Sequence, residues 1–226
     1  MATETASGSA SRTEVLRRIR TALGGGPSEN PQAIAGEWAA IDRSYQRSGT
    51  LEHHAVLEEL EDRLRDYDAH PEQVAQSGVT AKIAELLAAR GLRRLVVPEG
   101  LSEAIAAPLP EGFDFIVDRG LSPRELDQFE GVVTACTVAI SKTGTLILQN
   151  VSGQGRRAPT LIPDYHLCIV YAKDVVETVP EAMDRLGPLS TLATTFISGP
   201  SATADIEMTR IKGVHGPRFL DVILIV

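Results

Sequence analysis

The sequence predicts an α/β protein built around a parallel β-sheet. Helical segments with an apolar stripe alternate with short apolar runs, and glycine or proline separates one from the next. This alternation is typical of βαβ units, in which helices connect parallel strands. The 226 residues suffice for one large α/β domain with a helical extension, or for two small domains. Because aromatic residues make up only 4% of the chain, the core must be built from valine, isoleucine, leucine and alanine.

Composition argues against several classes of protein. The chain carries 22 basic and 30 acidic residues, and a net charge of −8 disfavours non-specific nucleic-acid binding. No run reaches the roughly 18 apolar residues of a membrane span, and the polar start lacks an apolar leader, so we expect a cytoplasmic protein. The two cysteines, Cys136 and Cys168, sit in apolar runs and are expected to be buried. Two thiols cannot by themselves hold a four-thiolate iron–sulfur cluster.

Residues 1–36 are predicted to be an extension, and residues 37–226 the α/β domain. A polar tail comes first, and Ser11 or Thr13 could cap a short helix whose apolar stripe is Val15, Leu16, Ile19 and Leu23. The arginines on its other faces favour a solvated surface, with docking to a partner as the alternative. A segment rich in glycine and proline, residues 24–36, reads as a linker and marks the boundary.

The first half of the domain shows the helix–strand alternation clearly. Helices are predicted over residues 52–67, 79–90 and 102–106, with a further short helix that begins at the capping box formed by Ser122 and Glu125. Strands are predicted over residues 69–74, 95–97 and 113–117. Gly91 is a natural stop for the second helix, because glycine adopts the left-handed conformation found after helix ends.

The second half is richer in strands. Two β-rich runs, residues 132–140 and 145–149, flank the turn at 142–144 and predict a β-hairpin. Further strands are predicted over residues 167–171, 194–198 and 219–226, and a helix over 180–186.

Three polar, glycine-containing turns follow apolar strands in this half, at residues 141–145, 153–158 and 198–207. Ligands of open α/β sheets bind beyond the carboxyl ends of strands, so these turns could converge on an anion. Plain turns and a solvated loop are the alternatives. The candidate ligand-binding residues are Thr143, Gly144, Thr145, Arg156, Arg157, Ser198, Gly199, Pro200 and Ser201.

Acidic residues and a histidine lie in the last of these segments. Asp205 and Glu207 together with His215 could bind a metal or transfer protons, and they are the candidate catalytic residues. The alternative is a helix start stabilised by its acidic residues. Asp164 and His166 form a similar weak pair. No motif of a zinc protease, a thiol oxidoreductase or an α/β-hydrolase is present, and we expect no metal in this chain.

Three stretches together resemble one known family. They are VVTACTVAISKTGTLIL at 132–148, GRRAPTLIPDYHLCIV at 155–170 and ISGPSATADIEMTRIKGVHGPRFLDVILI at 197–225, and they resemble the LUD domain of the lactate-utilisation protein C family. The resemblance implies a mostly parallel sheet with helices on both faces, like that of ribose-phosphate isomerase, glucosamine-phosphate isomerase and CoA-transferase-like proteins. The hairpin would then be a local elaboration.

The resemblance also implies a role. Such a protein would belong to an L-lactate utilisation system and act with iron–sulfur partner proteins in the oxidation of L-lactate to pyruvate. The clusters would belong to those partners, with no cofactor in this chain. The alternatives are a stand-alone enzyme or sensor for a small phosphorylated, carboxylate or CoA-linked metabolite, and a scaffold. One position departs from the family: Lys142 replaces the glutamate usual in the hairpin turn, which reverses the charge there.

Overall fold

The computed structural model describes residues 5–22, 30–187, 191–203, 211–213 and 216–226, without the side chains of 5–10, 202–203 and 211–212. It forms two compact units, Met1–Tyr45 and Gln46–Val226.

The first unit consists of two helices, α1 (Thr5–Ala22) and α2 (Pro31–Ala40). The predicted start of the first helix at Ser11 or Thr13 is wrong, because the tail before it contains no proline and continues the helix. The predicted linker is wrong from residue 31 onward. The side chain of Asn30 accepts a 3.0 Å bond from the N–H of Gln32, and proline follows it. Asparagine followed by proline is a helix-start signal. The predicted boundary at residue 36 therefore falls within α2.

A parallel sheet organises the second unit. Within the described residues it has six strands in the order β1-β12-β7-β4-β2-β3, and every neighbouring pair is parallel. Its strands are β1 (His70–Val74), β2 (Arg94–Val97), β3 (Asp114–Val117), β4 (Gly131–Ala135), β7 (Tyr165–Tyr171) and β12 (Phe219–Ile225). The α/β class predicted from the alternation of helices and strands is confirmed.

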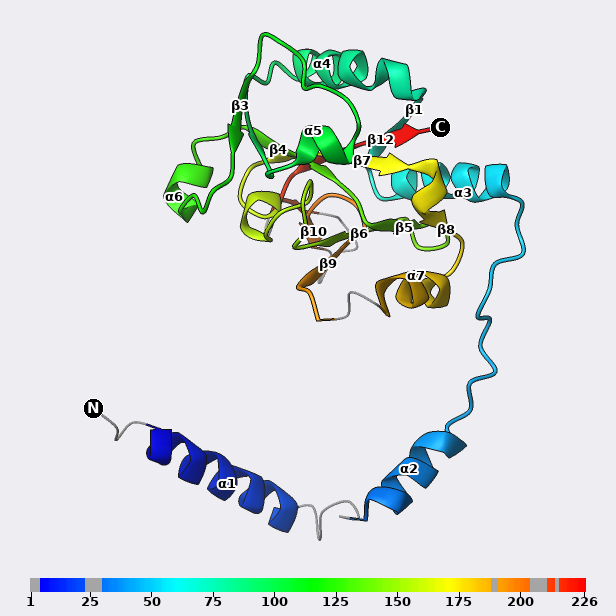
Figure 1. Ribbon diagram of the computed structural model, residues 1–226, viewed down its shortest axis with the longest axis vertical. Helices are drawn as coiled ribbons and strands as arrows, with labels where there is room; N and C mark the ends of the chain where they lie inside the picture. The colour runs from blue at the N-terminus through cyan, green and yellow to red at the C-terminus, as the bar shows by residue number, and fades with distance from the viewer. Residues whose placement is uncertain (1–4, 23–29, 188–190, 204–210, 214–215) are drawn as a thin grey trace. The chain divides into compact units, whose positions relative to one another are not determined.

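Helices cover both faces of this sheet (Figure 1). On one face α4 (Val79–Ala89) and α5 (Leu101–Ala104) pack against alternate residues of β2, β4, β7 and β12. On the other face α3 (His53–Asp66) and the short α6 (Pro123–Leu126) contact the intervening residues. The apolar stripe of α3 is buried as predicted, apart from Tyr67 beyond its end, which is 37% exposed.

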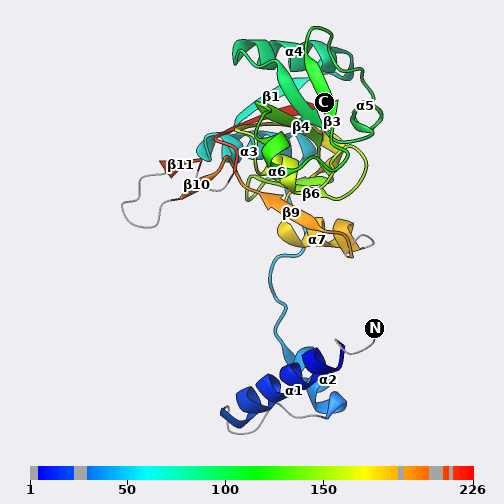
Figure 2. The same ribbon diagram turned by 90° about the vertical axis from the view of Figure 1, so that its left-hand side faces the viewer.

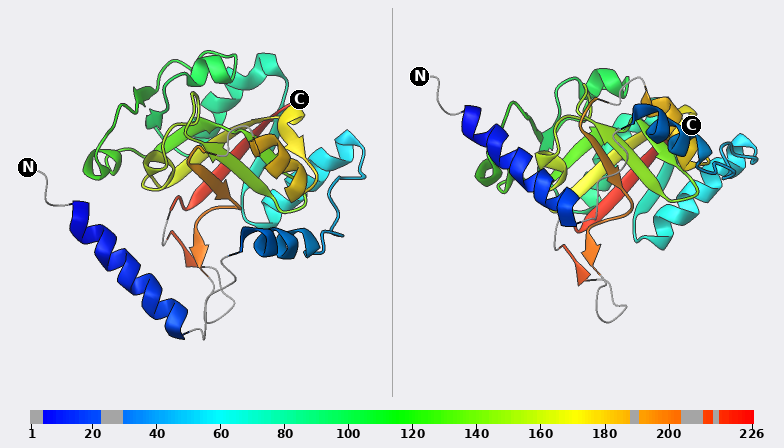
Figure 3. Two further views of the ribbon diagram at one scale, coloured as in Figure 1. Left: turned by 60° about the horizontal axis from the view of Figure 1, so that its bottom comes forward. Right: turned by 90° about the horizontal axis from the view of Figure 1, so that it is seen from below.

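A second sheet lies on the α3 face. Its order within the described residues is β8 (Val175–Val176), β5 (Val138–Ile140), β6 (Thr145–Gln149) and β9 (Thr194–Ile197), and it packs across β7 and β12 (Figure 3). The predicted hairpin is confirmed, since β5 and β6 are antiparallel. The prediction of one strand over 132–140 is wrong, because the chain leaves the parallel sheet after β4 and enters the second sheet at β5. Both pieces are fully buried, so no alternation of polar residues marks the change.

The remaining elements are short. Helix α7 (Val179–Leu186) begins at a capping box formed by Thr178 and Glu181, which was not predicted. Helix α5 starts after Gly100, which has φ +75°, and so the predicted cap at Ser102 is wrong. Strands β10 (Ala202–Thr203) and β11 (Ile211–Lys212) pair antiparallel and project from the body of the unit (Figure 2). Single 3₁₀ turns are η1 (Gln76–Gly78), η2 (Ala158–Thr160) and η3 (Ala172–Asp174). None of the helices described is both long and apolar enough to cross a membrane.

Candidate functional site

The predicted turns do not meet at a single edge of the sheet. The Gly153–Arg156 segment lies beyond the carboxyl ends of β2, β3 and β4, where the Ala135 N–H donates to the Gly153 carbonyl at 2.8 Å. The Ser198–Ser201 segment instead lies beside His166 and Leu220, near the amino ends of β7 and β12. The expectation that all three turns converge beyond the carboxyl ends of the strands is therefore wrong.

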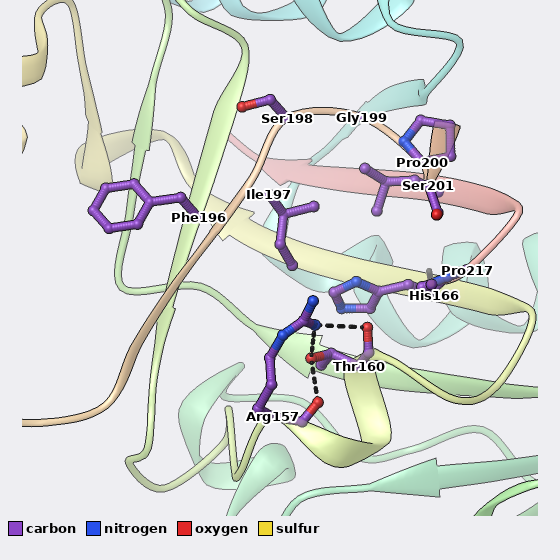
Figure 4. Close-up of a pocket in the computed structure, with 12 residues that line it drawn as sticks. Arg157, Thr160, His166, Phe196, Ile197, Ser198, Gly199, Pro200, Ser201 and Pro217 are labelled. Atoms are coloured by element: carbon purple, nitrogen blue, oxygen red, sulfur yellow. Dashed lines mark hydrogen bonds between the residues drawn. The ribbon is translucent and has the colours of Figure 1, made fainter. Parts of the chain in front are cut away.

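The Ser198–Ser201 segment forms one wall of a pocket of about 230 Å³, which we call the Arg157 pocket (Figure 4). The described part of its lining combines one cationic side chain with hydroxyl groups, a histidine and apolar walls. It is lined by Arg157, Thr160, His166, Phe196, Ile197, Ser198, Gly199, Pro200, Ser201, Gly216, Pro217 and Leu220. Five predicted ligand-binding residues thus come together here, Arg157 and the four residues from Ser198 to Ser201.

Arg157 supplies the positive charge of this pocket. Its Nη1 donates to the Thr160 carbonyl at 3.0 Å and to the Thr160 Oγ1 at 2.9 Å, and the Thr160 hydroxyl donates to the Arg157 carbonyl at 3.0 Å. These bonds hold the guanidinium in place without neutralising it, since no carboxylate among the described residues forms an ion pair with it. Partial loss of hydration lowers the pKa of Arg157, but arginine remains charged at physiological pH.

His166 lies next to Arg157 in the lining and is fully buried in β7. Its Nε2 is 2.8 Å from the Oγ1 of Thr134 on the neighbouring strand β4. Burial, and then the charge of Arg157, lower the pKa of His166 to about 3, so the imidazole is neutral at physiological pH. The predicted pairing of Asp164 with His166 is wrong: Asp164 is exposed and pairs with Arg218.

The hairpin turn supports the pocket wall from behind. The Ser198 Oγ is 2.8 Å from the Thr145 Oγ1, which is in turn 2.7 Å from the Thr143 Oγ1. Gly199 has φ +81°, and a Cβ there would lie 2.6 Å from the Cβ of Tyr67. Thr143, Gly144 and Thr145 do not line the pocket; the two threonine hydroxyls support the loop, and Gly144 lies against Arg63.

Arg156 points to a different cleft from its neighbour. Its Nε and Nη2 bind the Asp118 carboxylate at 2.7 and 2.9 Å, and Nη2 also donates to the Leu121 carbonyl at 2.5 Å. Burial alone would raise the pKa of Asp118, but the Arg156 guanidinium and two backbone N–H groups outweigh it and lower that pKa. The cleft, of about 500 Å³, is also bordered by Glu99 and Asn150. Asp118 already neutralises the Arg156 guanidinium, so the role of Arg156 is to hold this loop to the end of β3.

Lys142, the position that departs from the family pattern, pairs with Glu177 at 3.2 Å. The Glu177 side chain is only 4% exposed and accepts bonds from the N–H groups of Thr50 and Leu51 at 2.6 and 2.8 Å. We call this arrangement the Glu177 clamp. A glutamate at position 142 would face a buried carboxylate, so lysine suits this surrounding structure.

The catalytic candidates Asp205, Glu207 and His215 lie outside the described residues and remain predictions. In the part of the chain that is described, no three histidine, cysteine or carboxylate side chains gather in a way that could hold a metal.

Thr160 and the place of His166 in the pocket were not predicted from the sequence. Thr160 could have been found, because a hydroxyl residue that follows Arg157 within one 3₁₀ turn can accept a hydrogen bond from its guanidinium. His166 offered no local signal, because only the strand register brings it beside Thr134 and the Ser198 loop.

Comparison with known proteins places the chain in a family. A model of the LUD domain matches residues 117–225. The chain is 41% identical over 203 residues to the lactate utilization protein C of Deinococcus radiodurans, covering 86% of this chain and 91% of that protein. It is 33% identical over 104 residues to the protein of the same name from Shouchella clausii, covering 42% of this chain and 45% of that protein.

A solved structure gives the same assignment. The crystal structure of a DUF162 family protein from Deinococcus radiodurans superimposes with a TM-score of 0.68 at 37% identity, covering 78% of this chain and all of that one. Similarity of this extent, in sequence and in fold, is shared by members of one family. The chain therefore belongs to the LUD-domain family.

Proposed function

We propose that this chain is a component of an L-lactate utilisation system and acts with iron–sulfur partner proteins in the oxidation of L-lactate to pyruvate. The observation that carries the proposal is the 41% identity with the Deinococcus radiodurans lactate utilization protein C, which extends over 86% of this chain. The Arg157 pocket adds chemical support, because a guanidinium matches the geometry of a carboxylate.

The proposal assigns electron transfer to the partners. Oxidation of L-lactate to pyruvate releases two electrons, which the iron–sulfur clusters of the partners would accept. The chain has only two cysteines, Cys136 and Cys168, and Cys168 is fully buried, so they supply too few thiolates for a four-thiolate cluster. This chain would then bind or position a reactant or a partner.

Gene deletion in the host tests this role. We expect the deletion strain to fail to grow on L-lactate as sole carbon source and to grow normally on pyruvate, which enters metabolism after the proposed step. Return of the intact gene should restore growth on L-lactate. Normal growth of the deletion strain on L-lactate, with no second copy of the gene present, would refute the proposal.

A second candidate is a stand-alone enzyme or sensor for a small anionic metabolite. The observation that favours it is the Arg157 guanidinium, which has no carboxylate partner among the described residues. Thermal-shift measurements with sugar phosphates, CoA esters and 2-hydroxy acids test it directly. A ligand at 100 times its Kd should stabilise the fold by about 2.7 kcal/mol, and the absence of any shift would exclude this candidate.

A further inference from the structure

Half of the Arg157 guanidinium is available to a ligand. Nη1 donates both of its hydrogen bonds to Thr160, whereas Nε and Nη2 make no hydrogen bond to any described residue. In Figure 4 the terminal nitrogen not bonded to Thr160 points toward the space between Ile197 and His166. A guanidinium edge with two N–H donors binds one carboxylate through two parallel bonds.

The hydrogen bonds around His166 favour one tautomer of its neutral imidazole, and so one ring nitrogen as the acceptor. The Thr134 hydroxyl has one proton, and its Oγ1 donates to the Cys168 Sγ at 3.9 Å. We therefore assign the proton of the 2.8 Å bond between Thr134 and His166 to Nε2, the tautomer that fits a Thr134 hydroxyl turned toward Cys168. Nδ1 keeps a lone pair, and it forms no hydrogen bond within the described part of the chain. His166 Nδ1 is therefore a neutral hydrogen-bond acceptor in the same pocket as the Arg157 guanidinium.

The volume and the charge of the Arg157 pocket restrict the class of ligand that fits it. A pocket of about 230 Å³ is smaller than the roughly 300–1,000 Å³ of sites for drug-sized ligands, and so it is too small for CoA or a nucleotide. Arg157 is the one charged residue among the described residues that line it, which suits a monoanion better than a phosphate dianion. Ile197 and Leu220 provide an apolar wall for a short carbon chain.

The geometry points to the Arg157 pocket as a binding site for a short 2-hydroxy monocarboxylate, with the carboxylate on Arg157 and the 2-hydroxyl donating to His166 Nδ1. This inference rests on the proposed function, for which L-lactate is the reactant of this class, and it adds the place and the mode of binding. No chemical step is assigned to the pocket.

Calorimetric titration of the purified full chain tests the inference without any substitution. We expect L-lactate to bind about 3- to 10-fold more tightly than propionate, which has the same carbon chain but no 2-hydroxyl. Inorganic phosphate and CoA should neither bind in the pocket nor displace L-lactate. Equal affinity for L-lactate and propionate would refute the role of His166, and no binding of L-lactate at millimolar concentration would refute the site.

A pair of arginine variants locates the site. Arg157→Gln should weaken L-lactate binding by about 10- to 100-fold, because it removes a charge-assisted pair of hydrogen bonds. Arg119→Gln removes an equal charge at an exposed position and should leave the affinity unchanged. Circular dichroism checks that both variants are folded. Unchanged affinity in folded Arg157→Gln would overturn the inference.

Growth and binding together separate the two proposals. If the gene is required for growth on L-lactate but the purified chain binds no 2-hydroxy acid, the inference falls and the proposed function stands. If the chain binds L-lactate through Arg157 but its gene is dispensable for growth on L-lactate, the proposed function falls and the binding site stands.

Discussion

The strongest stability prediction concerns Asp221, a carboxylate buried in the central sheet. On β12 it accepts bonds from Arg90 Nε at 2.8 Å, Arg90 Nη2 at 2.5 Å and the Tyr165 hydroxyl at 2.9 Å. Burial, and then the charge of Asp221, raise the pKa of Tyr165, so its hydroxyl remains a donor at all physiological pH values. Asp221→Ala removes the acceptor of all three bonds.

The burial of Asp221 and Arg90 determines how much unfolding free energy the substitution should remove. Hydrogen bonds to charged groups contribute about 1.5–3 kcal/mol each, but the contributions are not additive within one cluster. Removal of one partner of a buried ion pair costs about 3–5 kcal/mol, because the other charge is left without compensation. The Asp221 side chain is 2% exposed and that of Arg90 24%, so water can reach Arg90 only in part. We therefore expect a loss of about 3–5 kcal/mol, a large share of the roughly 5–15 kcal/mol typical of a domain.

Urea unfolding followed by far-ultraviolet circular dichroism measures this loss. Circular dichroism is chosen because the single tryptophan, Trp38, belongs to the first unit and not to the unit that holds the sheet. The control is Asp114→Ala, which breaks the 3.6 Å pair with Arg94 at side chains that are 55% and 51% exposed. Exposed pairs contribute about 0–1 kcal/mol. A loss below about 1 kcal/mol for Asp221→Ala, or one equal to that of the control, would refute the reasoning.

Two further predictions concern the site and the loop beside it. Gly199 has a φ of +81°, and the Cβ of Gly199→Ala would lie 2.6 Å from the Cβ of Tyr67. The control is Gly112→Ala, where φ is +86° but no atom lies within 4 Å of the added Cβ. Gly199→Ala should therefore lower the free energy of unfolding by about 1–3 kcal/mol more than the control, and equal urea midpoints would contradict this steric argument. The pKa of Asp118 is lowered because Arg156 and backbone N–H groups outweigh its burial. Its stabilising effect should therefore be complete above the unfolded pKa of about 4 and be lost as pH falls through the folded value. In Asp118→Asn, the urea midpoint should therefore fall less steeply at acid pH than in the unsubstituted protein. The same steepness in both proteins would contradict this prediction.

Much of the fold could be predicted because its signals are local. The stripe of α3, the glycine after α4 and the capping box of α6 depend on neighbouring residues alone. The second sheet could not be predicted in the same way. Strands β5 and β6 are buried along their whole length, so they lack the alternation that distinguishes one sheet from another.

The site could be predicted only in part, and its paired arginines show why. Arg156 and Arg157 are adjacent and chemically identical, so the sequence marks both as anion-binding candidates. Their difference depends on distant partners: Asp118 lies 38 positions before Arg156 and matches its charge, whereas Arg157 turns toward Thr160 and the Ser198 loop. Only the folded chain shows which arginine is left for a ligand.

The Glu177 clamp has a consequence for where the second unit begins. Its carboxylate accepts the N–H groups of Thr50 and Leu51, and Glu181 accepts that of Gly49 at 3.0 Å, so these residues are structural parts of the unit although they precede its first helix. A Cβ at Gly49 would lie 2.4 Å from Glu177 Oε2, which leaves no room for another residue there. A shortened chain that starts at residue 46 keeps this anchor. One that starts at α3 would leave a buried carboxylate without its backbone donors, with Lys142 as its one remaining partner among the described residues.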